Sequence, residues 1–178
     1  MRGTITIFGG SSVEPGESGY DNALILGGLI AKAGFAVKNG GYGGTMEASA
    51  KGAVESGGEV IGILLKGLWG SEGNKWLSER KYASDLYERL KALIDSSDAF
   101  IILPGSSGTL AETSLLLDMM AKGIIATVPV IFVGNYWEPF LNFFESLIPN
   151  KKGLYSFVDE PQDVIRILEK NDVLNKSR

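Results

Sequence analysis

The sequence predicts an α/β protein with three layers, built on a doubly wound, Rossmann-like parallel sheet that forms a single domain over residues 1–178. Three observations lead to this prediction. Five short apolar runs lack polar alternation, which is typical of strands buried on both faces of a parallel sheet. Segments with helical periodicity separate these runs. A chain of 178 residues also suits one domain better than two.

The five predicted strands are mostly rich in Val, Ile and Phe, and most of them end at Gly or Pro. They cover residues 4–9, 35–39, 59–65, 98–105 and 128–134. Because a helical segment follows almost every strand, the strands are expected to form right-handed βαβ units.

Six helices are predicted between and after the strands, at residues 21–33, 45–56, 84–96, 110–122, 138–147 and 161–170. Gly34 and Gly57 are typical of glycines that end a helix, and Pro161 is suited to a first helical residue. Residues 66–82 form one long irregular connection, and connections of this length are often lids or binding loops.

The composition excludes several function classes. The sequence has no Cys and no His, which removes disulfides, thiolate metal sites and the commonest general base. Acid–base chemistry must then come from Asp, Glu, Lys, Tyr or backbone groups. The net charge is −4 and no basic block occurs, so binding of nucleic acid is disfavoured. No signal peptide or membrane-length apolar run is present, which predicts a cytoplasmic protein without a membrane partner.

Three turns rich in glycine and small hydroxyl residues follow predicted strands, at residues 9–12 (the first glycine turn), 40–46 (the second) and 104–109 (the third). Any one of them alone is more simply a tight strand–helix turn. Together, at one edge of a parallel sheet, they would line a crevice with backbone N–H groups. The predicted phosphate- or nucleotide-binding residues are Gly9, Gly10, Ser11, Ser12, Gly41, Gly43, Gly44, Thr45, Met46, Gly105, Ser106, Ser107, Gly108 and Thr109.

The third turn is the most informative because it precedes a predicted helix, whose N-terminus favours an anion. It is neither a Walker P-loop nor a dinucleotide fingerprint, since the required lysine and the GxGxxG spacing are missing. A monophosphate is therefore the expected ligand group. Glu112 follows Thr109 by three residues, and two interpretations stay open: a capping-box glutamate with Thr109 as N-cap, or a functional carboxylate.

The residues of these turns resemble the LOG ("Lonely guy") family, which is often mislabelled as lysine decarboxylases. The family signature P-G-G-x-G-T-x-x-E is similar to P-G-S-S-G-T-L-A-E at residues 104–112, with Ser106 in place of a glycine. The segments I-F-G-G-S-S and N-G-G-Y-G-G-T-M-E resemble the family's other two turns, with Thr45 and Glu47 as departures. The resemblance covers about residues 4–134.

The resemblance implies a catalytic arginine that precedes the strand of the signature, together with the signature glutamate, Glu112. Arg80 lies in the more similar local motif, but Arg89 lies 23 positions before Glu112, which is the family's spacing. We therefore select Arg89; the alternative is a solvated arginine on an amphipathic helix. The family's histidine and lysine beside this arginine are Tyr87 and Leu90 here. A further departure is Ser107, where the family usually has an aromatic residue.

The resemblance implies hydrolysis of the N-glycosidic bond of a nucleoside 5′-monophosphate, of the AMP or cytokinin riboside type, to free base and ribose 5-phosphate. No metal and no cofactor is implied. The family also implies a homodimer or higher homo-oligomer, and residues 115–120 could face a partner or the core of their own chain. The main alternative is a non-catalytic carrier of a nucleotide or molybdenum cofactor on the same fold. A purely structural or interaction domain would leave the three glycine turns unexplained.

Overall fold

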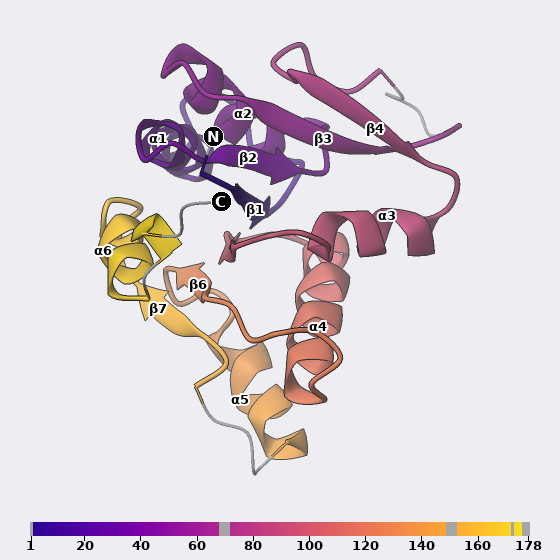
Figure 1. Cartoon of the computed structure of the whole chain (residues 1–178), viewed down its shortest axis with the longest axis vertical. Helices are drawn as coiled ribbons and strands as arrows, with labels where there is room; N and C mark the ends of the chain where they lie inside the picture. Colours follow the sequence, from indigo (N-terminus) through magenta and orange to yellow (C-terminus); the bar gives the residue numbers. More distant parts are fainter. Residues whose placement is uncertain (1, 68–71, 149–152, 172, 176–178) are drawn as a thin grey trace.

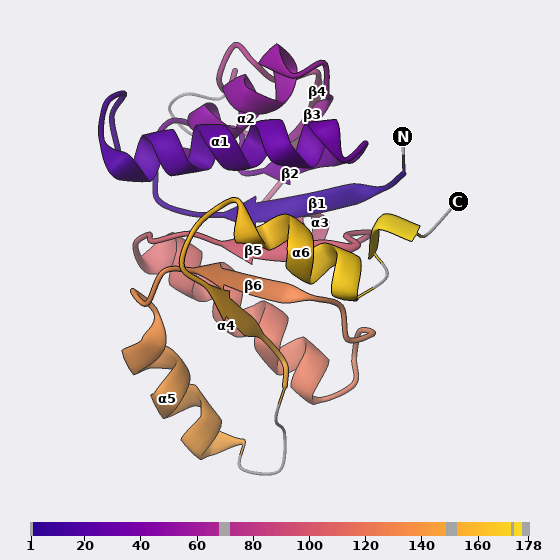
Figure 2. The same cartoon turned by 90° about the vertical axis from the view of Figure 1, so that its left-hand side faces the viewer.

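The computed structural model describes residues 2–67, 72–148, 153–171 and 173–175. In these residues seven strands form one parallel sheet with the order β4-β3-β2-β1-β5-β6-β7 (Figures 1 and 2). The chain runs outward from β1 to β4 and then returns to place β5 beside β1. The two halves of the sheet therefore wind in opposite directions, and the switch point lies between β1 and β5.

All five strands expected from the sequence are present. They are β1 (Thr4–Phe8), β2 (Ala36–Asn39), β3 (Val60–Leu65), β5 (Ala99–Ile102) and β6 (Val130–Val133). Residues of β2, β5 and β6 are buried on both faces, as a parallel sheet between two helical layers requires. In the register of β1 with β5, Phe8 lies opposite Ile102, so both strands end at the same edge of the sheet.

Six α-helices in the described part of the chain cover the two faces of this sheet and confirm the predicted three layers. One hydrophobic core contains residues of α1 (Ser18–Lys32), α2 (Thr45–Glu55) and α6 (Asp163–Lys170). The other contains residues of α3 (Leu86–Ile94), α4 (Ser107–Ala121) and α5 (Glu138–Leu147). Figure 1 shows α1 and α6 on one side of the sheet and α3 and α4 on the other.

Two strands were not predicted, and both lie at sheet edges. β4 (Glu79–Ala83) is almost entirely exposed, so it lacks the apolar run that marked the other strands. The predicted irregular connection at residues 66–82 is wrong over this strand, and residues 68–71 lie outside the described part. β7 (Ser156–Val158) has only three residues and is too short for a pattern to show. A short 3₁₀ helix, Val173–Asn175, follows α6.

Two predicted helix starts differ from the structure, whereas two predicted helix ends agree with it. Helix α4 begins at Ser107 with Ser106 as its N-cap, so Thr109 lies in the first turn and the capping-box interpretation with Thr109 as N-cap is wrong. Helix α6 begins at Asp163, so Pro161 precedes the helix. Gly34 and Gly57 do follow helix ends with positive φ, at 86° and 78°, as expected for glycines at such ends.

The apolar segment of α4, residues 115–120, packs in the hydrophobic core of its own chain. Leu116, Leu117 and Met120 are buried among residues of α3 and α5, whereas Leu115 and Met119 are half-buried. The homodimer stays a prediction. None of the helices in the described residues combines the length and the hydropathy needed to cross a membrane.

Helices α1 and α2 pack unusually closely because glycines face each other between them. A Cβ atom on Gly52 would lie 1.9 Å from the carbonyl oxygen of Leu24, and one on Gly27 would lie 2.0 Å from that of Ser49. Both contacts are to backbone atoms, which cannot move aside without shifting a helix. The position of α2, which begins at the second glycine turn, therefore depends on these glycines.

We expect Gly52→Ala to lower the free energy of unfolding by at least about 2 kcal/mol, because the added methyl group overpacks two helix backbones. Chemical denaturation measures this change. Gly108→Ala is the matched control: its Cβ would meet nothing within 4 Å, so its stability should stay near that of the parent. Equal stability of Gly52→Ala and the parent protein would contradict the packing described.

Candidate functional site

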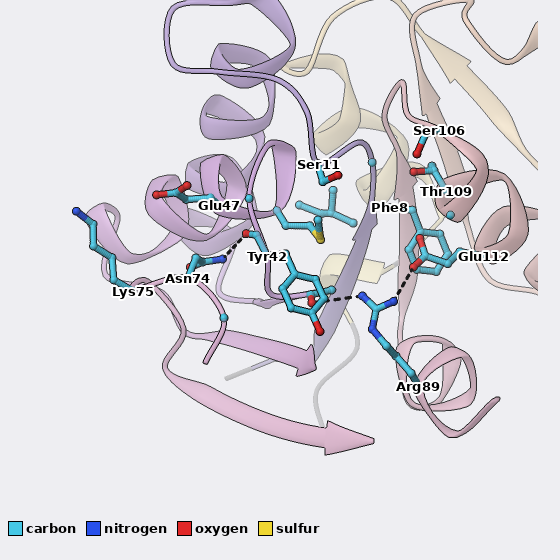
Figure 3. Close-up of a pocket in the computed structure, with 17 residues that line it drawn as sticks. Phe8, Ser11, Tyr42, Glu47, Asn74, Lys75, Arg89, Ser106, Thr109 and Glu112 are labelled. Carbon is cyan, nitrogen blue, oxygen red and sulfur yellow. Dashed lines mark hydrogen bonds and ion pairs between the residues drawn. The ribbon is translucent and has the colours of Figure 1, made fainter. Parts of the chain in front are cut away.

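A cavity of about 750 Å³ opens at the carboxyl edge of the sheet, beside the switch point between β1 and β5. All three glycine turns contribute to its wall (Figure 3). The residues predicted from the sequence that line it are Gly9, Ser11, Gly43, Met46, Arg89, Ser106, Gly108, Thr109 and Glu112. This location is where ligands bind in open α/β sheets.

The three turns are tied together by backbone hydrogen bonds centred on Gly10. The N–H of Gly10 donates to the carbonyl of Pro104 at 3.0 Å, which joins the first turn to the third. The carbonyl of Gly10 accepts from the N–H of Thr45 at 2.9 Å and from its Oγ1 at 3.0 Å, which joins the first turn to the second. Segments far apart in the sequence therefore form one rigid wall.

The glycines of these turns fall into two groups. Gly9, Gly44 and Gly105 are required by packing, because a Cβ on each would lie 2.2–2.5 Å from an oxygen of a facing residue. Gly108 faces open space, and Gly43 meets only the carbonyl of Ser11 at 3.6 Å. Since Gly43 and Gly108 both line the cavity, the absence of their side chains leaves room for a ligand to approach the backbone.

Two helix N-termini reach the cavity, and they differ in charge. At α4, the N-cap Ser106 makes no side-chain capping bond, and the first helical turn carries no acidic residue. At α2, the N-cap is Gly44, and the first helical turn carries Glu47. The first N–H groups of a helix have no intrahelical acceptor. The N-terminus of α4 is therefore the better site for an anion, because a carboxylate at α2 would repel one.

Arg89 reaches the cavity from α3 and is held by backbone carbonyls. Its Nε donates to the carbonyl of Ile63 at 3.0 Å and its Nη2 to that of Gly40 at 3.3 Å. The guanidinium carbon also lies 5.4 Å from the centre of the Tyr42 ring, within the range of a cation–π contact. These contacts orient the charged group while leaving further N–H donors for Glu112 or a ligand.

Glu112 projects from α4 toward Arg89, as Figure 3 shows. The distance from its Oε1 to Nη1 of Arg89 is 3.9 Å, and the two side chains are only 13% and 14% exposed. Burial raises the pKa of Glu112 to about 7, although the charge of Arg89 acts in the opposite direction. A carboxyl group with this pKa can both lose and accept a proton near neutral pH.

Arg80, the alternative arginine, lies on the exposed strand β4. Its guanidinium donates to the carbonyls of Glu72, Asn74 and Leu77 and so supports the connection before β4. It does not line the cavity, whereas Arg89 does. The spacing criterion therefore selected the arginine that lies beside Glu112.

The other residues predicted to bind phosphate do not line the cavity. Gly10, Gly44, Thr45 and Gly105 form the contacts between turns described above. Gly41 is covered by the side chains of Leu64 and Leu77, while Ser12 and Ser107 are exposed. Gly10 and Thr45 already donate their N–H groups to carbonyls, so their contribution to a site is to hold its wall.

Sequence reasoning missed part of the wall, namely Ile7, Phe8, Gly40, Tyr42, Glu47, Gly73, Asn74 and Lys75 as lining residues. Asn74 connects two of these segments, since its Nδ2 donates to the carbonyl of Tyr42 at 2.9 Å. Figure 3 shows Glu47, Asn74 and Lys75 across Tyr42 from Arg89 and Glu112. Tyr42 occupies a variable position of the glycine turn, so no motif marked it. The prediction that residues 66–82 hold a binding loop was the one signal for Asn74.

The fold and the cavity define a Rossmann-like α/β protein with a ligand-sized site at the switch point of its sheet. Residues 46–168 match the family model described as "Possible lysine decarboxylase". The chain belongs to this family, the LOG family.

Named relatives and solved structures agree with this assignment. The chain is 30% identical over 174 residues to a "Probable cytokinin riboside 5′-monophosphate phosphoribohydrolase" of Oryza sativa subsp. japonica, covering 93% of this chain and 71% of the relative. It is 31% identical over 147 residues to a cytokinin riboside 5′-monophosphate phosphoribohydrolase of Arabidopsis thaliana, covering 81% of this chain and 68% of the relative. The molybdenum cofactor carrier protein of Chlamydomonas reinhardtii has a similar structure, with 25% identity and a TM-score of 0.79, over 99% of this chain and 100% of that one.

The raised pKa of Glu112 makes stability depend on pH. Its pKa in the folded state, about 7, exceeds the ordinary value of 4.5, so the folded state binds the proton more tightly. This contribution to stability is full below about pH 4.5 and is lost as the pH rises through 7. As the pH rises through this range, we expect the free energy of unfolding of the parent protein to fall by roughly 3 kcal/mol. The same fall should be absent in Glu112→Gln.

Chemical denaturation at about pH 5 and about pH 8 measures this difference. Glu55→Gln, on the exposed surface of α2, is the matched control and should follow the parent protein. If Glu112→Gln and the parent lost the same stability between these pH values, Glu112 would not be the buried titrating group.

Proposed function

We propose that this protein hydrolyses the N-glycosidic bond of a nucleoside 5′-monophosphate to the free base and ribose 5-phosphate. The observation that carries the proposal is the approach of Arg89 and Glu112 to 3.9 Å inside a cavity whose wall includes an uncapped helix N-terminus. The family membership and the names of the relatives support it.

In this proposal the 5′-phosphate lies at the N-terminus of α4. Ser106, Gly108 and Thr109 line the cavity there, and the open space beside Gly108 lets phosphate oxygens approach backbone N–H groups. Arg89 and Lys75 are the cationic residues of the wall, and Figure 3 shows both apart from Ser106. Backbone dipoles therefore hold the phosphate, and this binding energy fixes the sugar relative to Glu112.

Glu112 then acts at the anomeric carbon. As the C1′–N bond breaks, its electron pair moves to the base and the ribose gains oxocarbenium character. A nearby carboxylate stabilises this positive charge and accepts a proton from the attacking water, whose oxygen forms the new bond to C1′. Glu112 then passes this proton to the departing base, which regenerates the carboxylate and gives the neutral base and ribose 5-phosphate as products.

Arg89 stays protonated throughout, because arginine is not deprotonated in proteins. Its remaining N–H donors can bind the base as negative charge develops on it. The carbonyls of Ile63 and Gly40 and the ring of Tyr42 hold the guanidinium in place before the ligand arrives. Of the residues that depart from the family pattern beside it, Tyr87 is 84% exposed and lies outside the cavity wall.

Lysine decarboxylation, the activity in the description of the family model, is not proposed. A Schiff-base lysine needs a desolvated amine that faces the substrate. Lys75 lines the cavity but is exposed, and the buried Lys38 directs its Nζ to the carbonyls of Ala92 and Asp95 at the end of α3.

A carrier function is the second candidate. The observation that favours it is the similarity to the molybdenum cofactor carrier protein along essentially the whole of both chains. The same cavity could hold a phosphate-bearing cofactor without turnover. For either function we also propose that the protein forms a homodimer or higher homo-oligomer and binds its small-molecule ligand in the cytoplasm.

We expect the protein to release adenine from AMP, and Glu112→Gln to lower kcat by at least about 100-fold. Arg89→Ala should lower it by at least about tenfold, since one charged donor to the leaving base is lost. Because Glu112 acts as the carboxylate, kcat/KM should rise as the pH rises through about 7.

Glu169→Gln and Arg166→Ala, both at exposed positions of α6, are the matched controls and should keep full activity. Chromatography of the released base measures each rate. Undiminished turnover in Glu112→Gln would refute the mechanism. No turnover of any nucleoside monophosphate, together with tight binding of a molybdopterin, would replace the hydrolase with the carrier.

A further inference from the structure

Three consecutive carbonyl groups at the third glycine turn each accept a hydrogen bond from a residue that is distant in the sequence. The carbonyl of Leu103 accepts from Nε1 of Trp137 at 3.0 Å. That of Pro104 accepts from the N–H of Gly10 at 3.0 Å. The carbonyl of Gly105 accepts from the hydroxyl of Tyr136 at 3.0 Å. The backbone before α4 is thus fixed at every peptide group that leads into the helix.

The two aromatic donors lie between β6 and α5, outside the cavity wall. Trp137 is 7% exposed and packs edge-on against Phe140, which anchors it in the core. The ring of Tyr136 packs edge-on against Trp137 at 4.9 Å between ring centres, although Tyr136 itself is 56% exposed. Trp137 therefore holds Tyr136 in position to reach the Gly105 carbonyl.

The bond from Tyr136 also fixes the N–H of the next residue. The carbonyl of Gly105 and the N–H of Ser106 belong to one planar trans peptide group, so they point in opposite directions. Because the carbonyl is directed to Tyr136, the N–H of Ser106 is directed away from it. Ser106 lines the cavity and Tyr136 does not, which favours the cavity side as the direction of this N–H.

We propose that Tyr136 is a positioning residue that keeps the Ser106 amide turned toward the anionic group of the ligand. Gly105 has no side chain, so its ψ angle allows this peptide group to rotate and bring the carbonyl oxygen toward the cavity instead. An oxygen there would repel a phosphate. The inference rests on the proposed function, because it takes the N-terminus of α4 as the phosphate site.

The test compares Tyr136→Phe with the parent for binding of AMP and of adenosine by calorimetry. The variant keeps the ring and loses only the exposed hydroxyl, so its thermal midpoint should stay near that of the parent. We expect AMP to bind about tenfold more weakly, which corresponds to one hydrogen bond to a charged group, while adenosine binding stays unchanged. A residue with only a structural role would affect both ligands alike.

Tyr155→Phe is the matched control, because the Tyr155 hydroxyl donates to Glu145 and to no part of the third turn. It should bind both ligands as the parent does. An undiminished preference for AMP in Tyr136→Phe would overturn the inference and leave the phosphate site intact. If the parent protein itself bound AMP no more tightly than adenosine, this result would contradict the phosphate site and the proposed function, and not only the role of Tyr136.

Discussion

The site depends on one constraint, which is the position of Gly10 between the two other glycine turns. Its N–H donates to the carbonyl of Pro104 and its carbonyl accepts from Thr45, so one residue joins turns that lie 94 and 35 positions further along the chain. Atoms approach so closely at these contacts that a Cβ on Gly44 or Gly105 would overlap a neighbour. The small residues that looked at first like a ligand-binding motif thus have two separate tasks. Some of them build the wall, and others leave space in front of it.

The electrostatics of the cavity follow from which charges reach it. Glu47 disfavours an anion at α2, while the first turn of α4 carries no acid. Arg89 and Glu112 are buried together, yet burial outweighs the attraction between them and raises the pKa of Glu112 to about 7. The cavity therefore offers neutral donors at one end and a titratable carboxyl beside a fixed cation at the other. This separation suits a ligand with a phosphate and a reactive sugar.

Most of the fold could be predicted because its central strands are buried on both faces and leave an apolar run in the sequence. The edge strands β4 and β7 could not, because an exposed polar strand and a strand of three residues leave no such pattern. Arg89 was found by its distance from Glu112 along the chain, which reflects the fixed lengths of the helix and strand between them. Tyr42, Asn74 and Tyr136 were missed, since their roles depend on contacts between segments distant in sequence.

A crystal structure of the Glu112→Gln variant with bound AMP is the most direct measurement of the central claim. The account predicts a phosphate within hydrogen-bond distance of the backbone N–H groups at residues 106–109. It also predicts that C1′ lies beside the side chain at position 112 and that the base lies beside Arg89. A phosphate bound near Lys75, with the sugar remote from both positions, would contradict it.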